Sequence, residues 1–219
     1  MPPRKRNYHH GDLRRTLLGA SVELIVERGL DALSLREVAR RAGVSPAAPY
    51  HHFASREELL VALALEGFTM LALAMQTARE AATGASAIER LGATGEAYVR
   101  FAVAHPAHFR LMFRPSLVSL GALPEEGAPG QAFALLVDGV SDVLESEDVR
   151  MNVDRRGLVL VAWSLVHGAA ELLLDGPLAN GLPELSIRAS EVPALLNRSF
   201  EGILSALSGR PPPARRRKA

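Results

Sequence analysis

The 219-residue sequence contains no cysteine, and only 5% of its residues are aromatic. Without cysteine the chain has no disulfide framework, no thiolate nucleophile and no Cys-ligated zinc or iron–sulfur site. Strand-like alternation bounded by turn signals is hard to find, and the basic start is not followed by the apolar run of a secretory signal. Hydrophobic residues make up 48% of the chain and charged residues 22%, which excludes wholesale disorder. We therefore expect a helical, soluble and cytoplasmic protein.

Charge is distributed unevenly along the chain. Residues 1–56 hold ten Lys and Arg against five Asp and Glu, whereas residues 57–209 hold ten against nineteen. The last ten residues hold five basic side chains and no acidic one. A basic head on an acidic body suggests that the head meets a polyanion.

Two apolar runs, residues 59–75 and 157–174, are long enough to be considered as membrane spans. A spanning helix needs about 20 apolar residues, and an acidic side chain at its centre costs roughly 2.5–3.5 kcal/mol. Because Glu66 interrupts the first run and Glu171 the second, we expect both to be buried helices of a soluble bundle.

Apolar spacing and capping signals predict an all-α fold. Three capping boxes, Ser34–Glu37, Ser55–Glu58 and Ser86–Glu89, mark helix starts. Gly-rich and Pro-rich segments mark loops around residues 120–130 and 175–183. The patterns predict helices over residues 12–28, 35–42, 46–53, 56–82, 86–104, 107–114, 130–146, 153–174 and 193–208.

The second and third predicted helices form a helix-turn-helix candidate. Apolar side chains at i, i+3, i+4 and i+7 give the helix at 35–42 one buried face, and Gly43 supplies a turn residue that tolerates positive φ. Ser45 is the expected N-cap of the next short helix. The outward side of that helix carries small or hydrogen-bonding residues and no acid, so it can approach the phosphate-lined major groove.

Residues 12–71 resemble the DNA-binding domain of TetR-type transcriptional regulators. The resemblance lies in the run Val-Ala-x-x-Ala-Gly-Val-Ser-x-x-x-x-Tyr-x-x-Phe-x-Ser-Arg-Glu-x-Leu, residues 38–59. The segments His105–Phe113 and Trp163–Gly168 are similar to one subgroup of the regulatory domains attached to such heads. The resemblance implies an N-terminal three-helix DNA-binding domain and a C-terminal helical bundle for effector binding and dimerisation. The expected boundaries are a basic arm at 1–11, the helix-turn-helix domain at 12–57, the bundle at 58–209 and a disordered basic tail at 210–219.

The resemblance also implies roles for particular residues. Arg36 matches a base-reading position, where a guanidinium pairs with guanine, while Tyr50 and Arg56 match phosphate-holding positions. The N-terminal arm could reach the minor groove. The expected DNA contacts are Arg4, Lys5, Arg6, Ser34, Arg36, Ser45, Ala47, Ala48, Tyr50, His51 and Arg56.

Pro49 departs from the family pattern, in which an aliphatic residue is common. If Ser45 is the N-cap, the missing amide of Pro49 removes the first intrahelical hydrogen bond. We therefore expect an irregular start to the recognition helix.

Two interpretations of the body remain open at this point. Trp163 and His167 share a helix face, and such pairs are either core residues or the wall of an effector pocket. The candidate effector residues are Phe101, His105, Phe109, Met112, Phe113, Trp163 and His167. The late apolar helices are expected to form a two-fold dimer, with candidate interface residues Leu158, Val161, Leu165, Leu172, Leu196, Phe200, Ile203 and Leu207.

The function expected from these features is a homodimeric, sequence-specific DNA-binding regulator. It would be a repressor released from a palindromic operator by a small-molecule effector. Metal binding and cofactors are not expected. The adjacent pairs His9-His10 and His51-His52 cannot share one helical face, and no carboxylate stands at a matching spacing to His105 and His108. Nucleophile-elbow and phosphate-cradling motifs are missing. The alternative is a helical carrier or enzyme whose basic head is incidental.

Overall fold

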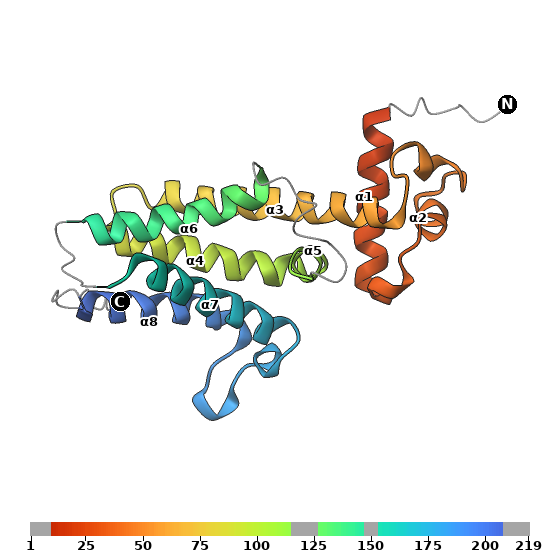
Figure 1. The fold of residues 1–219 in the computed structure, drawn as a ribbon. Helices are drawn as coiled ribbons and strands as arrows, with labels where there is room; N and C mark the ends of the chain where they lie inside the picture. The colour runs from red at the N-terminus through yellow and green to blue at the C-terminus, as the bar shows by residue number, and fades with distance from the viewer. Residues whose placement is uncertain (1–9, 115–126, 147–152, 208–219) are drawn as a thin grey trace. The chain divides into compact units, whose positions relative to one another are not determined.

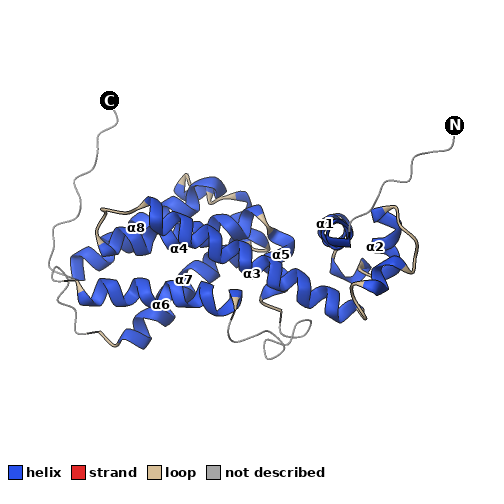
Figure 2. Cartoon of the chain, turned by 90° about the horizontal axis from the view of Figure 1, so that it is seen from above, coloured by secondary structure: helices blue, strands red, loops and turns tan. Residues whose placement is uncertain are grey.

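The computed structural model describes residues 10–114, 127–146 and 153–207, and within these ranges the fold is all-α, as expected. Figures 1 and 2 show the helices along the chain. In the described part, the only β-bridge pairs Leu182 with Ile187. The α-helices are α1 His10–Arg28, α2 Leu35–Ala42, α3 Arg56–Ala81, α4 Ala87–Ala104, α5 Pro106–Met112, α6 Ala128–Glu145, α7 Arg155–Leu174 and α8 Val192–Leu207.

The chain divides into two compact units. Unit 1 comprises residues 1–67 and 106–123, and unit 2 comprises residues 68–105 and 124–219. The division falls inside α3, later than the boundary expected at residue 57, and it assigns α5 to the N-terminal unit. The long helix α3 therefore contributes residues to both units.

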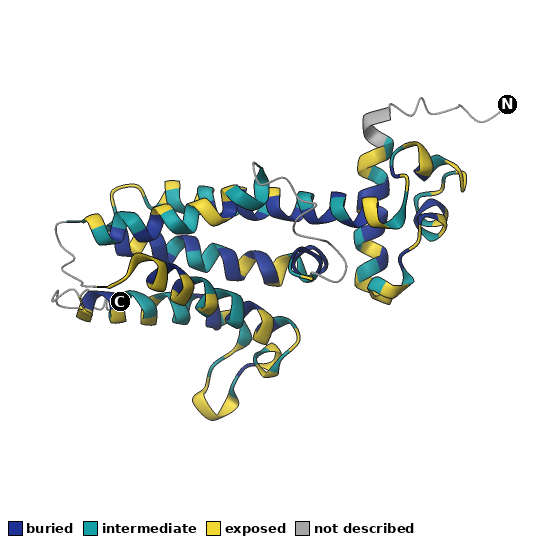
Figure 3. Cartoon of the chain, viewed as in Figure 1, coloured by how far each residue is buried: buried dark blue, intermediate teal, exposed yellow. Residues whose placement is uncertain are grey.

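Unit 1 is built around buried aliphatic and aromatic residues, and the ribbon is dark blue at buried positions in Figure 3. The apolar period of α1 and α2 places one face of each helix in this interior, as the sequence predicts. Helix α5 packs in the same unit, where a Cβ added to Gly67 of α3 would lie 2.6 Å from Sδ of Met112. The largest fully buried side chains of unit 1 are Leu17, Leu24, Leu33, Phe53, Leu59, Leu60, Leu63, Phe109, Leu111 and Met112.

Unit 2 is a helical bundle in which α4 contacts α6, α7 and α8. Its core cluster comprises Ala87, Ile88, Leu91, Val140, Val143, Leu158, Val159 and Leu204. An ion pair between Arg79 and Asp142, with an N–O distance of 2.7 Å, ties the end of α3 to α6. The bundle architecture expected for the C-terminal region is thus present in this unit.

The predicted capping boxes form to different extents. At Ser86 the box is complete: the Ser86 side chain accepts from the Glu89 amide at 3.2 Å, and the Glu89 carboxylate accepts from the Ser86 amide at 2.8 Å. Ser34 caps α2 by accepting from the Glu37 amide, but the Glu37 carboxylate pairs with arginines instead. The helix starts are therefore correct even where the reciprocal bond is replaced.

Helices α3 and α7 are long and apolar enough to cross a membrane by length and composition alone. Half of the most apolar stretch of α3 and one third of that of α7 are buried within the protein. The burial of α3 fits the interpretation of this helix as part of a folded domain, and α7 packs against α4 and α6 although most of its apolar stretch is not buried.

Candidate nucleic-acid interface and effector region

The turn after α2 has the geometry that the helix-turn-helix pattern predicts. Leu35, Val38 and Ala39 of α2 are buried, so the apolar face packs inward. Gly43 adopts the left-handed conformation with φ 68° and ψ 30°, which only glycine enters without a steric penalty. The Val44 amide donates to the Ala39 carbonyl at 3.0 Å and closes the helix end.

We call residues 45–53 the recognition segment. The α-helix predicted over residues 46–53 with Ser45 as its cap is wrong: the segment is a turn followed by a 3₁₀ helix, Ala48–His51, whose N-cap is Ala47. The Ser45 carbonyl accepts from the Ala48 amide at 3.0 Å. The α-helical bond from this carbonyl to residue 49 cannot form, since proline has no N–H, and the bond observed is the shorter one of a turn or 3₁₀ helix. The expected irregularity at Pro49 is therefore confirmed.

Buried side chains anchor the recognition segment while its other face stays open. Pro49 and Phe53 are buried, and the Arg14 guanidinium lies 5.4 Å from the centroid of the Phe53 ring. The Tyr50 side chain is 58% exposed. Of the predicted base-facing residues, Ala48 is half-buried and the exposed ones are Ser45, Ala47 and His51.

Most arginines around α2 are held by carboxylates. Arg28 and Arg40 both bind Glu37, at 3.0 and 2.5 Å, and Arg41 binds Glu23 and Glu27 of α1. The hydrogen bond from Arg40 lowers the pKa of Glu37. Arg36 differs: it is exposed, and no ion pair to it is found among the residues that the structure describes.

Arg56 begins α3, and its guanidinium donates to two backbone carbonyls. Its Nε donates to the Leu33 carbonyl at 2.8 Å and its Nη2 to the Leu30 carbonyl at 3.1 Å. Both carbonyls lie in the connection between α1 and α2, just before Ser34. Arg56 thus holds the start of α2 against the start of α3. Arg4, Lys5 and Arg6, like the tail at 210–219, lie outside the described residues.

Unit 2 holds four of the predicted effector residues, Phe101, His105, Trp163 and His167, and His167 belongs to a short chain of polar contacts. Nδ1 of His167 lies 2.8 Å from the Tyr98 hydroxyl, and Nε2 lies 4.0 Å from the Glu171 carboxylate. Burial lowers the pKa of His167 and raises that of Tyr98. Ring contacts extend the group from His167 to Trp163 and from Trp163 to Phe133, at 6.0 Å each. Phe101 is buried and lies 5.0 Å from the His105 ring.

The other three predicted effector residues lie in unit 1. Phe109 and Met112 are fully buried, and the Phe109 and Phe113 rings are 5.0 Å apart. On the same helix Nε2 of the buried His108 lies 3.1 Å from the Glu66 carboxylate of α3. A single effector pocket built from both units therefore stays a proposal.

Four polar or aromatic residues were missed by sequence reasoning. Glu171 stands four residues after His167, so helical spacing could have indicated it. Tyr98, Phe133 and Glu66 reach their partners from other helices, and no local pattern announces such a contact.

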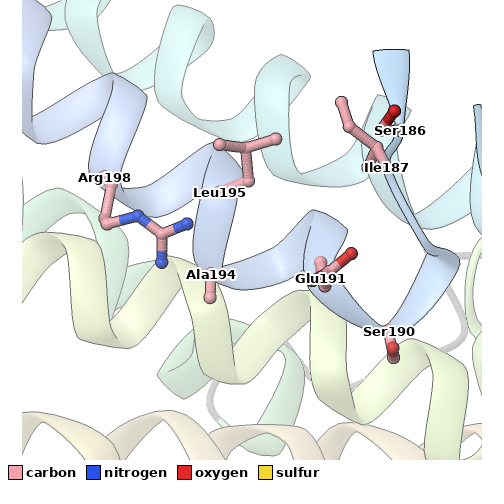
Figure 4. Close-up of a pocket in the computed structure, with 7 residues that line it drawn as sticks. All are labelled: Ser186, Ile187, Ser190, Glu191, Ala194, Leu195 and Arg198. Carbon is pink, nitrogen blue, oxygen red and sulfur yellow. The ribbon is translucent and has the colours of Figure 1, made fainter. Parts of the chain in front are cut away.

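The structure also shows a hollow of about 420 Å³ at the start of α8, drawn in Figure 4. None of the predicted effector residues lines it. Its Glu191 carboxylate accepts from the Arg188 side chain at 2.7 Å, and this hydrogen bond lowers the pKa of Glu191 to about 2. The lining residues are Ser186, Ile187, Ser190, Glu191, Ala194, Leu195 and Arg198.

The predicted interface residues are divided between exposed and buried positions. Val161 and Ile203 are 58% exposed, and Leu172 and Leu207 are also exposed. Leu165, Leu196 and Phe200 are half-buried. Leu158 is buried in the core cluster of unit 2 together with side chains of α4, α6 and α8, so it is not available to a second copy.

Metal ligands do not gather in the described ranges, where no group of three His, Asp or Glu side chains could hold an ion.

Three features define a helix-turn-helix DNA-binding protein. Helix α2 buries its apolar face, a glycine turn follows it, and the recognition segment after the turn is exposed and carries no acidic residue. The family model described as "Bacterial regulatory proteins, tetR family" matches residues 17–63, and that of the "Tetracyclin repressor-like, C-terminal domain" matches residues 91–207. The chain therefore belongs to the TetR family of bacterial regulatory proteins and is a DNA-binding transcriptional regulator. The subgroup suggested by residues 163–168 stays a prediction.

Solved structures agree with this assignment. A protein of unknown function from Rhodococcus sp. RHA1 is 35% identical, with a TM-score of 0.73 over 91% of this chain and 99% of that one. The TetR family transcriptional regulator PfmR from Thermus thermophilus is 24% identical, with a TM-score of 0.62 over 86% and 96%. The fatty acid degradation regulator FadR from Bacillus halodurans is 16% identical, with a TM-score of 0.66 over 86% and 97%. The last two show a shared fold alone.

Proposed function

We propose that this regulator is a cytoplasmic homodimer that represses transcription at a palindromic operator and is released by a small-molecule effector. The observation that carries the proposal is the exposed recognition segment, which contains no acidic residue. It follows the turn at Gly43, and the helix before that turn carries the exposed Arg36. One such segment covers only a few base pairs, so a useful operator needs two copies related by two-fold symmetry.

Apolar stripes on α7 and α8 support the dimer. Val161, Leu165 and Leu172 recur on one side of α7 at helical spacing, and none of them is fully buried within the chain. On α8 the same spacing relates Leu196, Phe200, Ile203 and Leu207. Two such stripes from each copy would form a four-helix bundle whose contact removes apolar surface from water.

Two groups of side chains support an effector region. In unit 2 the Tyr98–His167 pair and Trp163 combine polar atoms with aromatic walls, which is the composition of small-molecule sites. In unit 1 the fully buried Met112 offers an adaptable wall. Because α3 contributes to both units, an effector that prefers one arrangement of this helix would change the spacing of the two recognition segments.

Family membership argues against the alternative of a carrier or enzyme with an incidental basic head. Members of a family of regulatory proteins act by binding rather than by turnover, and we propose no catalytic residue.

The decisive experiment is selection of bound sites from a random duplex pool with the full-length protein. We expect a palindromic sequence, and binding that weakens steeply with salt as the phosphate-neutralising cations require. Compounds are then screened for release of the selected duplex. Selection of no sequence, or binding that is indifferent to salt, would contradict the proposal.

A further inference from the structure

The recognition segment lacks the side chains that make bidentate hydrogen bonds to bases, and few of its backbone amides are free to do so. Pro46 and Pro49 have no backbone N–H, and the amides of Ala48 and Tyr50 already donate to carbonyls of the segment at 3.0 and 3.2 Å. Residues 43–55 contain no Arg, Lys, Asn, Gln, Asp or Glu. The side chains that pair bidentately with guanine or adenine are therefore missing from the segment itself.

The segment exposes small apolar groups instead. Pro46 and Ala47 are exposed, while Ala48 is half-buried. They stand at its N-terminal end, which is the part of the second helix that meets base edges in a helix-turn-helix protein. The methyl group of thymine is the apolar feature of the major groove, and small apolar side chains contact it.

Two of the three arginines of α2 do not replace the missing donors. Arg40 and Arg41 are bound to carboxylates of α1 and α2. The exposed Arg36 is the candidate for a separate guanine contact, one position per half-site.

We propose that the recognition segment reads thymine methyl groups through Pro46 and Ala47. The proposal rests on the proposed function that two copies bind an operator, and it specifies the chemistry of each half-site: one or two thymines beside the base read by Arg36. Ser45 and His51 remain as polar neighbours of these contacts.

The test uses the wild-type full-length protein and the duplex obtained by selection. Each thymine of one half-site is replaced in turn by deoxyuridine, which removes the methyl group and leaves every hydrogen-bonding group in place. We expect about fourfold weaker binding at one or two positions, the value for losing one buried methyl group. Binding that is specific but insensitive to every such replacement overturns the proposal, as does a selected half-site without thymine.

Combining the deoxyuridine replacements with a protein variant gives a double-mutant cycle. Ala47→Gly removes one of the two proposed apolar partners, so the deoxyuridine penalty should disappear at one thymine position in this variant. The exposed Ala54→Gly serves as a matched control and should keep the penalty. If the deoxyuridine penalty persists unchanged in Ala47→Gly, Ala47 does not contact the methyl group. Pro46→Gly is then measured in the same way, and an unchanged penalty there as well overturns the proposal. Absence of binding to any duplex at low salt overturns the proposed function as well, and so differs from methyl-independent binding.

Discussion

The Asn197 side chain of α8 lies directly against the Cα of Gly92 on α4. A Cβ added at residue 92 would stand 2.0 Å from Oδ1 of Asn197 and 2.6 Å from Oε1 of Glu201. Nδ2 of Asn197 also donates to the Glu96 carboxylate at 3.5 Å. The close approach of α4 and α8 therefore depends on the missing side chain at this position.

Gly92→Ala should destabilise unit 2. The added methyl group must displace Asn197 or separate the helices, and such overpacking typically lowers the free energy of unfolding by about 1–3 kcal/mol. Denaturant unfolding followed by circular dichroism measures the change. Gly19→Ala is the control, because a Cβ there meets nothing within 4 Å and α1 should gain helix propensity. Equal effects of the two substitutions would contradict the close approach.

Glu201 should make unit 2 less stable as the pH rises. Burial, followed by the charges of Glu89 and Glu96, raises the pKa of its carboxyl group above the ordinary 4.5. The folded state then holds its proton more tightly than the unfolded state, so this contribution is present below pH 4.5 and is lost as the pH passes the raised value.

Glu201→Gln should accordingly raise the Tm at pH 7 and have a smaller effect at pH 4. Thermal melts at the two pH values make the comparison, and Glu184→Gln on the exposed 3₁₀ segment is the control. A Glu201→Gln protein that melts lower than wild type at pH 7 would show that the charge is favourable there.

Arg36→Ala should relax base discrimination at one position per half-site. Loss of a bidentate contact to guanine removes roughly 1–3 kcal/mol of discrimination. Competition among duplexes that differ at single positions measures the change, with Arg40→Ala as the control because Glu37 already binds Arg40. Uniform loss across all positions would remove Arg36 from the base-reading residues.

Arg56→Met should lower the Tm and weaken binding to all duplexes alike, since the side chain would no longer hold the carbonyls of Leu30 and Leu33. The dependence of log affinity on log salt distinguishes this role from the phosphate contact implied by the family. We expect an unchanged slope, because the guanidinium is already engaged. A salt-dependence slope whose magnitude falls by about 0.9 for each Arg56 replaced would instead indicate a lost phosphate contact.

Ile203→Glu should produce monomers that bind the selected duplex poorly. The side chain is 58% exposed in the single chain, so the substitution leaves the core of unit 2 intact while placing a charge in the proposed interface. Sedimentation or light scattering reports the mass. Leu185→Glu, at an exposed position outside α7 and α8, is the control. A dimeric Ile203→Glu protein would exclude this part of α8 from the interface.

Much of the fold follows from local sequence signals. Helix starts at Ser34 and Ser86 and the turn at Gly43 depend on residues within four positions of one another, so a linear pattern predicts them. The 3₁₀ helix after Ser45 was predictable only as an irregularity, since the missing amide of Pro49 does not by itself determine which backbone conformation replaces the α-helix. Leu158 has the same spacing as the exposed residues of α7, and its burial depends on packing with side chains of α4, α6 and α8 that are distant in sequence. The contacts of Arg56 and Tyr98 span 23 and 69 residues and arise from tertiary packing alone.

The two prolines of the recognition segment have an entropic consequence. They restrict the backbone before any partner arrives, so little conformational freedom remains to be lost when the protein meets the double helix. The same rigidity limits how the DNA-binding surface can change in evolution. New sequence preferences would arise by exchanging the side chains at positions 46 and 47 on an unaltered turn, rather than by reshaping the turn itself.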